Sequence, residues 1–238
     1  MSDIRDSINS ILPIRDRTPK RRSILVALSG IDGCGKGYLT AKIIEGLKAA
    51  GMNAIAIHGD GWLNLPERRF NSDNPGEHFY QNAFRFDEMF SQLVLPLRDR
   101  RSIRLEADFL EETDTAYRRH LYQFKNVDVI VLEAIYLIQQ KFINNYDFSI
   151  WIDCGFQTAL KRALSRNQEG LSEREIIDAY RTVFFPAQII HFQRDDPKRL
   201  AGAIVNNDPE ITEFKDYPKL NENLVVGLQP HRAVKRYK

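Results

Sequence analysis

Three residues between positions 30 and 36 have the types and spacing of a phosphate-binding loop. The segment "GIDGCGKG" places Gly30, Gly35 and Lys36 as the pattern G-x-x-x-x-G-K requires. In such a loop backbone N–H groups point at a phosphate, and the lysine ammonium reaches the β and γ oxygens. A glycine-rich structural turn is the alternative. We predict that the phosphates of a nucleoside triphosphate contact Gly30, Ile31, Asp32, Gly33, Cys34, Gly35, Lys36, Gly37 and Tyr38.

Gly37 stands where the pattern has a serine or threonine whose hydroxyl ligates Mg²⁺. Thr40 lies three residues later, a rise of roughly 4.5 Å along a helix, and is a poor direct replacement. A water molecule could fill the position, because Mg²⁺ keeps several waters in proteins. We therefore expect metal binding to depend more on carboxylates elsewhere in the chain.

Two carboxylates are well placed for this chemistry. Asp60 follows the apolar run 53–58, and Glu133 lies near the end of the run "VIVLEA". The carboxyl ends of parallel strands surround the ligand crevice of an open sheet, so both side chains can face the phosphates. Asp60 could accept a proton from an attacking hydroxyl or ligate the metal, and Glu133 could hold Mg²⁺ directly or through water. The alternatives are an Asx turn at Asp60 and a carboxylate at a helix start for Glu133.

A sheet is needed to bring these candidates together, and the sequence predicts one. Short apolar runs typical of buried parallel strands occur at 23–29, 53–58, 127–138, 148–154 and 201–205. Helical spacing occurs between them, at 38–51, 79–101, 158–166 and 173–193. Ser172 and Glu175 have the spacing of a capping box. This alternation predicts an α/β fold with three layers, in which helices cover both faces of a mostly parallel sheet.

Composition narrows the class of partner. The 238 residues suit one large α/β domain or a domain with a small appendage, and the net charge is +2. That balance favours small-molecule partners over nucleic acid or an anionic membrane. Two cysteines, histidines without metal-ligand spacing and no apolar run of about 20 residues predict a soluble, cytoplasmic protein without disulfides or structural zinc. The oligomeric state is left open.

The ends of the chain are more polar than its middle. We interpret residues 1–22 as an N-terminal arm, 23–207 as the main domain and 208–238 as a C-terminal tail. The cluster "RDRTPKRR" at 15–22 could be a nucleic-acid patch or a targeting signal. No aromatic residues are interleaved with its charges, which favours a solvated arm.

The ordered series of motifs resembles the uridine kinase and phosphoribulokinase group of P-loop kinases over about 23–207. The matching segments are "GIDGCGK", "HGDGWL", "VIVLEAIYLI", and "WIDCGFQTALKRALSRNQEG" followed by "AYRTVFFPAQIIHF". The resemblance implies a P-loop NTPase fold with a small helical lid at about 162–174. It also implies Mg²⁺-dependent transfer of the γ-phosphoryl of ATP to an alcohol. Asp60 takes the position of the acceptor base, Lys36 that of the phosphate lysine, and Arg162 and Arg166 those of the lid arginines.

The acceptor is less well defined than the phosphate donor. Arg68, Arg69, His78, Tyr80 and Arg85 offer donors and a ring for a nucleoside or a related alcohol. Gly37, Ala134 and the "DGWL" segment depart from the family pattern. Alternative functions are therefore a nucleotide-binding protein with weak or no kinase activity and a nucleoside monophosphate kinase. For Cys34, we expect a loop-filling role, with a redox switch as the alternative.

Overall fold

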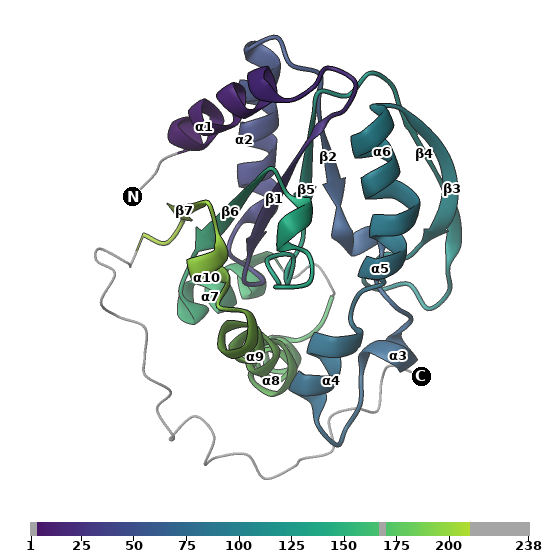
Figure 1. Cartoon of the computed structure of the whole chain (residues 1–238). Helices are drawn as coiled ribbons and strands as arrows, with labels where there is room; N and C mark the ends of the chain where they lie inside the picture. Colours follow the sequence, from purple (N-terminus) through teal and green to yellow (C-terminus); the bar gives the residue numbers. More distant parts are fainter. Residues whose placement is uncertain (1–3, 167–169, 210–238) are drawn as a thin grey trace.

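A five-stranded sheet forms the centre of the protein, in the order β2-β5-β1-β6-β7 (Figure 1). The computed structural model describes residues 4–166 and 170–209. The strands are β1 (Ile24–Gly30), β2 (Ala54–His58), β5 (Val129–Glu133), β6 (Phe148–Asp153) and β7 (Ala203–Asn206). All neighbouring pairs in this sheet are parallel, so their carboxyl ends lie at the same edge. The five predicted strands are confirmed, although the expected strand at 127–138 ends earlier, at Glu133.

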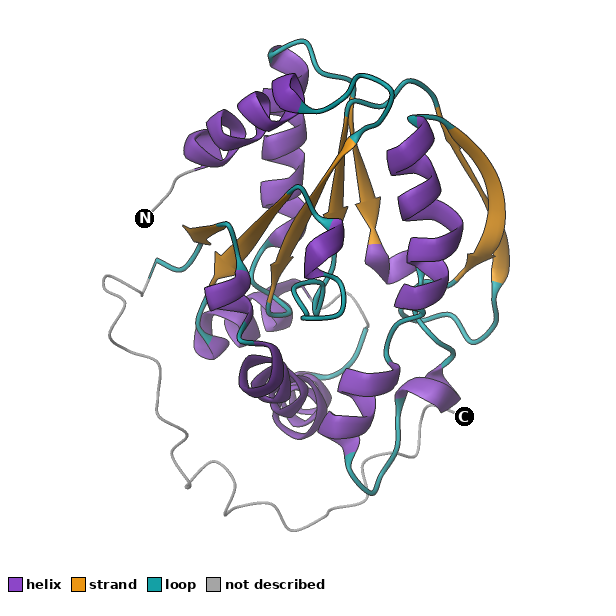
Figure 2. Ribbon diagram, in the orientation of Figure 1, coloured by secondary structure: helices purple, strands orange, loops and turns teal. Residues whose placement is uncertain are grey.

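Helices cover both faces of the sheet (Figure 2). Alternate residues of β1 point to opposite faces: Val26 belongs to the core beneath α1 (Ile4–Arg17) and α2 (Lys36–Ala49). Leu25 belongs to the core beneath α5 (Phe86–Met89) and α6 (Leu95–Arg100). The remaining helices are α3 (Pro66–Arg69), α4 (Pro75–Asn82), α7 (Phe156–Arg166), α8 (Glu173–Ala179), α9 (Phe185–Asp195), α10 (Pro197–Leu200) and the 3₁₀ turns η1 (Gly59–Gly61) and η3 (Ile143–Asn145). The predicted three-layer α/β/α arrangement is confirmed.

Two predicted long helices are interrupted: residues 83–85 break the first, and both contain a π-helical turn just before a proline. The segment 79–101 divides into α4, α5, a π-helical turn η2 (Phe90–Val94) and α6, and the segment 173–193 into α8, a π-helical turn η4 (Tyr180–Phe184) and α9. Pro96 and Pro186 lie in the first turns of α6 and α9. Proline has no N–H for the i−4 carbonyl, and a π turn lets the helix continue past it. The predicted capping box of Ser172 and Glu175 is confirmed at the start of α8.

The antiparallel hairpin of β3 (Ile103–Phe109) and β4 (Arg118–Phe124) was not predicted. Its outer face is polar and exposed, while Ala107 and Tyr122 are buried. Tyr122 stacks on the buried Trp62 with ring centroids 5.9 Å apart. In β3, Ile103, Leu105, Ala107 and Phe109 alternate with polar residues, so a period-2 strand signal was present in the sequence and was missed.

The interpretation of 15–22 as a solvated arm is wrong for its first and last arginines. Residues 4–17 form α1, which packs beside α2 (Figure 1). Arg15 is buried and pairs with Asp128 at 3.3 Å, and Arg22 makes two hydrogen bonds to Asp147, at 2.9 and 2.7 Å. These carboxylates lie at the amino ends of β5 and β6 and attract the arginines to the sheet. Residues 1–3 of the expected arm lie outside the described residues.

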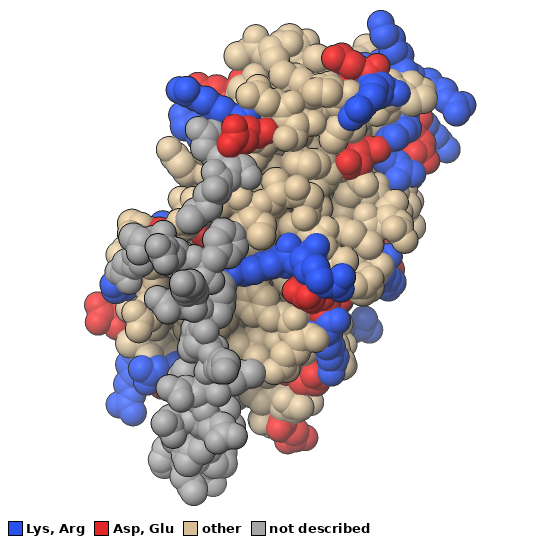
Figure 3. All heavy atoms as spheres, turned by 60° about the vertical axis from the view of Figure 1, so that its left-hand side comes forward, with Lys and Arg blue, Asp and Glu red and all other residues tan. Residues whose placement is uncertain are grey.

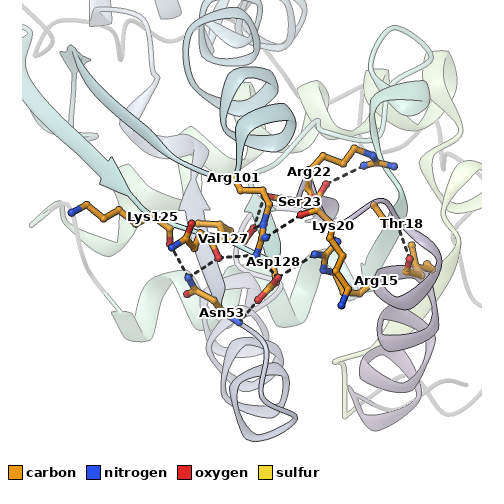
Figure 4. Close-up of polar contacts among 12 residues, drawn as sticks. Arg15, Thr18, Lys20, Arg22, Ser23, Asn53, Arg101, Lys125, Val127 and Asp128 are labelled. Carbon is orange, nitrogen blue, oxygen red and sulfur yellow. Dashed lines mark hydrogen bonds and ion pairs between the residues drawn. The ribbon is translucent and has the colours of Figure 1, made fainter.

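Arg15, Asn53, Arg101 and Asp128 form a polar group that we call the Asp128 cluster (Figure 4). One carboxylate oxygen of Asp128 accepts a hydrogen bond from Arg101 at 2.6 Å and pairs with Arg15. The other accepts from the backbone N–H of Asn53 at 3.0 Å. Arg101 also donates to the carbonyls of Val127, Asn126 and Lys20. The cluster ties α1 and α6 to the amino edge of the sheet.

The surface is charged, and the expected tail begins with a residue that packs on the domain. Lys and Arg side chains are interspersed with Asp and Glu side chains on the face in Figure 3. Among the described helices, none is long and apolar enough to cross a membrane. Asp208, the first residue of the expected tail, is buried and accepts hydrogen bonds from Gly155 N–H and the Thr158 hydroxyl at 2.7 and 2.8 Å. Residues 210–238 of that tail lie outside the described residues.

Candidate functional site

The predicted phosphate loop connects the carboxyl end of β1 to the first turn of α2. Gly33 and Gly35 have φ angles of +74° and +92°, which L side chains rarely adopt. A Cβ atom at Gly33 would lie 2.6 Å from the carbonyl oxygen of Ala159 in α7. The first N–H groups of a helix lack partners within it, and the helix dipole favours negative charge there. The loop therefore has the geometry of an anion-binding site, held closely against α7.

Lys36 is the positive charge around which the carboxylates of this site lie. Its side chain is buried, and the ammonium donates to the carbonyl of Ile31 at 3.2 Å. Burial by itself lowers the pKa of Lys36, but Cys34 and the carboxylates of Asp32, Asp60 and Glu133 outweigh that effect and raise it. The fold thus brings the predicted lysine together with both predicted carboxylates.

Glu133 ends β5 beside the ends of both neighbouring strands. It is paired in register with His58 of β2, and the Nδ1 atom of His58 lies 2.9 Å from its carboxylate. Burial raises the pKa of Glu133, but the hydrogen bond with His58, the charge of Lys36 and the Thr40 hydroxyl together lower it. Glu133 is therefore a buried carboxylate that keeps its charge. His58 was missed in the sequence, although its place at a strand end beside Glu133 was a usable signal.

Asp60 lies in η1, immediately after β2. A Cβ atom at Gly59 would lie 2.6 Å from the Cβ of Ala134, and one at Gly61 would lie 2.5 Å from the Phe109 ring. The two glycines therefore let the turn pack against the end of β5 and the hairpin. Asp60 stays accessible to solvent, yet partial desolvation, with repulsion from Glu133 and Asp32, raises its pKa against the attraction of Lys36. A carboxylate with a raised pKa is better suited to accept a proton.

The residues present fit a Mg²⁺ ion that arrives with phosphates. In residues 4–166 and 170–209, no group of three or more His, Cys, Asp or Glu side chains could hold a metal alone. Magnesium is usually held by one or two carboxylates together with substrate phosphates and waters. Glu133 and Asp60 supply such carboxylates next to the phosphate loop. The buried Thr40 hydroxyl, which has no hydrogen bond of good geometry with any described residue, lies beside Glu133.

The two predicted lid arginines have different surroundings. Arg162 donates to the carbonyls of Cys34 and Asn207, at 3.1 and 2.8 Å, and so supports the phosphate loop. The side chain of Asn207 also donates to Cys34, at 2.7 Å, and this residue was missed in the sequence. Arg166 is exposed at the end of α7. Both arginines line an open cavity of about 430 Å³, and their catalytic role stays a prediction. Residues 167–169 of the predicted lid lie outside the described residues.

The predicted acceptor residues divide into two groups. Tyr80 and Arg85 line a cavity of about 370 Å³ together with Gln81, Phe84, Phe86, Asp87, Glu88, Gln139, Lys141 and Phe142. The Tyr80 hydroxyl donates to Asp195, and Arg85 donates to Glu88 and to the carbonyls of Leu63 and Asp108. Arg68 and His78 lie elsewhere and contact each other through the Arg68 carbonyl. Arg69, the fifth candidate, is buried and donates to the carbonyl of Glu112 at 2.9 Å. The role of all five stays a prediction.

Two tyrosines beside the loop were missed in the sequence. The Tyr180 hydroxyl donates to Asp32 across 148 positions of the chain, a contact that no local pattern reveals. Tyr136 follows β5 with a φ of +59°, an uncommon conformation for a bulky residue.

Burial raises the pKa of the Cys34 thiol in the phosphate loop to about 11. Cys34 is therefore a protonated, buried side chain at neutral pH, which favours the loop-filling role over the redox switch.

Comparisons with known proteins identify the fold. No protein-family model matches the sequence, and no curated protein matches it. Among solved structures, a possible uridine kinase from Bacillus stearothermophilus aligns with a TM-score of 0.66 and 16% identity, over 85% of this chain and 99% of the other. The fold is that of P-loop kinases.

Two further P-loop kinase structures agree with this assignment. A candidate fructose transport system kinase from a Silicibacter species has a TM-score of 0.68 and 20% identity, over 86% of this chain and all of the other. D-glycerate 3-kinase from Cryptococcus neoformans has a TM-score of 0.59 and 11% identity, over 87% and 96%. The resemblance to P-loop kinases that the motifs implied is thus confirmed for the fold.

Proposed function

We propose that the protein transfers the γ-phosphoryl group of ATP to a hydroxyl of a small molecule. The observation that carries this proposal is the convergence of Lys36, Asp60 and Glu133 at the end of a phosphate-binding loop. These residues come from α2, η1 and β5, and each has a part that phosphoryl transfer requires. A loop that only binds phosphate has no need of an accessible carboxylate with a raised pKa.

The loop and its supports bind the nucleotide. Backbone N–H groups at the start of α2 and the Lys36 ammonium contact the β- and γ-phosphates, while Arg162 and Asn207 fix the Cys34 carbonyl behind them. The open cavity of about 430 Å³ next to Arg162 has room for the rest of the nucleotide. When bound, Mg²⁺ would neutralise charge between the phosphates. Glu133 would hold it directly or through water, with Asp60 as the second candidate ligand.

Asp60 acts on the acceptor. Its carboxylate takes the proton of the acceptor hydroxyl as that oxygen forms a bond to the γ-phosphorus. The bond from the γ-phosphorus to the bridging oxygen breaks, and ADP leaves with its electron pair. Lys36 stabilises the negative charge that spreads over the phosphoryl oxygens, and Arg166 is the exposed arginine able to approach them.

The acceptor is an alcohol of modest size. The aligned structures carry names that refer to uridine, fructose transport and D-glycerate kinases. We propose a nucleoside or a related alcohol, as in uridine kinases, with Tyr80 and Arg85 at one cavity and Arg68 and His78 as further candidates. The motif resemblance and the charged rim of the Tyr80 and Arg85 cavity support this choice.

Acceptor-dependent release of ADP tests the proposal. The protein is incubated with MgATP and a panel of nucleosides, glycerate, pantothenate and sugars or sugar phosphates, with Asp60→Asn as the matched control. Turnover with at least one acceptor, lost in the control, is the expected result. Tight MgADP binding without turnover above the control would instead favour a nucleotide-binding protein with no efficient catalysis. Gly37, which removes the usual metal-binding hydroxyl, is the observation behind that second candidate.

A further inference from the structure

The Thr40 hydroxyl is bonded differently from those of Ser10 in α1, Thr182 in η4 and Thr18 just after α1. Ser10, Thr18 and Thr182 each donate to the carbonyl four residues earlier, at 2.8, 2.8 and 2.7 Å. This bond is the usual way for a helical serine or threonine to satisfy its hydroxyl. Thr40 is only 2% exposed and makes no such bond with any described residue. Its contact with Glu133 falls short of good hydrogen-bond geometry, and a buried hydroxyl that is bonded so poorly costs free energy, so another role must account for it.

The Thr40 hydroxyl faces the candidate metal carboxylate. Thr40 lies on α2 one turn after Lys36, on the side of the helix that packs against β5. It lies beside Glu133, whose pKa it helps to lower. By contrast, a Cβ atom at Gly37 would have no atom within 4 Å, so the position is open. Position 37 thus has no hydroxyl group, whereas position 40 has one that is buried.

We propose that Thr40 orients the Glu133 carboxylate toward the metal and thereby replaces, one turn deeper in the helix, the hydroxyl that Gly37 lacks. This inference rests on the proposed MgATP-dependent function. Thr40 is a positioning residue, because its burial prevents contact with the phosphates. Groups that orient metal-binding carboxylates commonly matter nearly as much as the ligands. The hydroxyl donates to one Glu133 oxygen, and the other oxygen remains with His58 or turns to the metal.

Metal-dependent nucleotide affinity tests this inference without relying on turnover. Binding of a fluorescent ADP analogue is measured in excess EDTA and across a Mg²⁺ titration, for the wild type, Thr40→Val and Thr40→Ser. Thr18→Val is the matched control, because Thr18 is a buried threonine directly after α1 with an ordinary i−4 bond. Gly37→Ser is added to the wild type and to Thr40→Val.

The expected result is a loss confined to the metal. Thr40→Val should weaken Mg²⁺ binding to the nucleotide complex by roughly 10- to 100-fold, while affinity in EDTA stays within about twofold. Thr40→Ser and Thr18→Val should resemble the wild type. Gly37→Ser should restore much of the Mg²⁺ affinity in Thr40→Val and change the wild type little, since the two hydroxyls would serve the same metal.

The other outcomes distinguish a failure of the Thr40 inference from a failure of the proposed function. Equal Mg²⁺ dependence in Thr40→Val and the wild type, or equal losses with and without metal, would show a packing role for Thr40 and leave the proposed function intact. If Thr40→Val does not fold, Thr40→Ser is used in its place. A Mg²⁺ affinity of Thr40→Ser that differs from the wild type, and that adding Gly37→Ser does not restore, would also count against the inference. A wild type that binds nucleotide without any Mg²⁺ effect would instead overturn the proposed function.

Discussion

The two edges of the central sheet carry polar groups of opposite character. At the amino edge, the Asp128 carboxylate is bonded on both oxygens, and Arg101 donates to a carboxylate and three carbonyls (Figure 4). At the carboxyl edge, one buried lysine faces three carboxylates, and the buried Thr40 hydroxyl makes no hydrogen bond of good geometry within residues 4–166 and 170–209. A fully bonded cluster stabilises a fold, whereas surplus charge and unmatched groups are typical of a site that awaits a ligand. The comparison therefore assigns stability to one edge and function to the other.

Asp60→Asn should give the largest change at the carboxyl edge. Loss of the proposed base should lower kcat by roughly 10²- to 10⁴-fold. The raised pKa of Asp60 means that its charge is disfavoured in the folded state, so the melting temperature should be unchanged or higher. Steady-state kinetics and thermal unfolding measure both effects. A variant with full activity, or one that melts clearly lower, would contradict this assignment.

Asp128→Ala should give the opposite result at the amino edge. It leaves the buried Arg15 and the Arg101 guanidinium without their carboxylate, and should reduce the free energy of unfolding by about 2 to 4 kcal/mol. Urea unfolding measures the loss, and turnover below the unfolding range should stay within about twofold. Asp99→Asn is the control, since its pair with Arg98 is exposed and should contribute under about 0.5 kcal/mol. A large loss of turnover in folded Asp128→Ala would remove the contrast between the edges.

Asp147→Asn should show a stability loss that depends on pH. Burial raises the pKa of Asp147, but the hydrogen bonds from Arg22 and the Leu25 N–H outweigh it and lower that pKa. A depressed carboxyl pKa stabilises the fold above the unfolded value and loses this effect as the pH falls through the folded value. We expect about 1 to 2 kcal/mol of destabilisation at pH 7 and less at about pH 3, which lies below the ordinary carboxyl pKa, so that part of the effect is lost. Equal losses at both pH values would mean that the carboxylate charge plays no part.

Gly33→Ala and Gly51→Ala compare the same backbone conformation at the two ends of α2. Both glycines have positive φ, at +74° and +82°. A Cβ at Gly51 meets nothing within 4 Å, so its cost should be the conformational one of about 1 kcal/mol. At Gly33 the Cβ also meets the Ala159 carbonyl, and the phosphate loop must shift. Only Gly33→Ala should therefore weaken ADP binding, as measured by calorimetry. Equal ADP affinities in the two variants would mean that phosphate binding does not depend on the conformation of the loop.

The parts of the structure that sequence predicted are those set by local patterns. Continuous apolar runs gave the five strands, and the parallel arrangement then placed Lys36, Asp60 and Glu133 at one edge. Ser172 and Glu175 gave the start of α8 because a capping box is local.

The features that sequence did not predict depend on contacts between distant residues. The basic residues at 15–22 suggested an arm, while Ile8 and Ile11 carried the helical spacing that fixes α1. Tyr180 bonds Asp32, and Asn207 bonds Cys34, over separations that no periodicity links. Thr40 was judged by its distance from Gly37 along the helix, whereas its position beside Glu133 follows from the packing of α2 on β5.

Calorimetric titration of MgADP into the wild type, Lys36→Ala and Asp128→Ala tests the contrast between the two edges most directly. Each protein is held below its own unfolding range. The wild type and Asp128→Ala should bind with affinities within about twofold of each other. Lys36→Ala should bind at least ~100-fold more weakly, because a buried charge-assisted contact to the phosphates is lost. Unchanged binding in Lys36→Ala, or no binding by the wild type, would contradict a nucleotide site at the carboxyl edge.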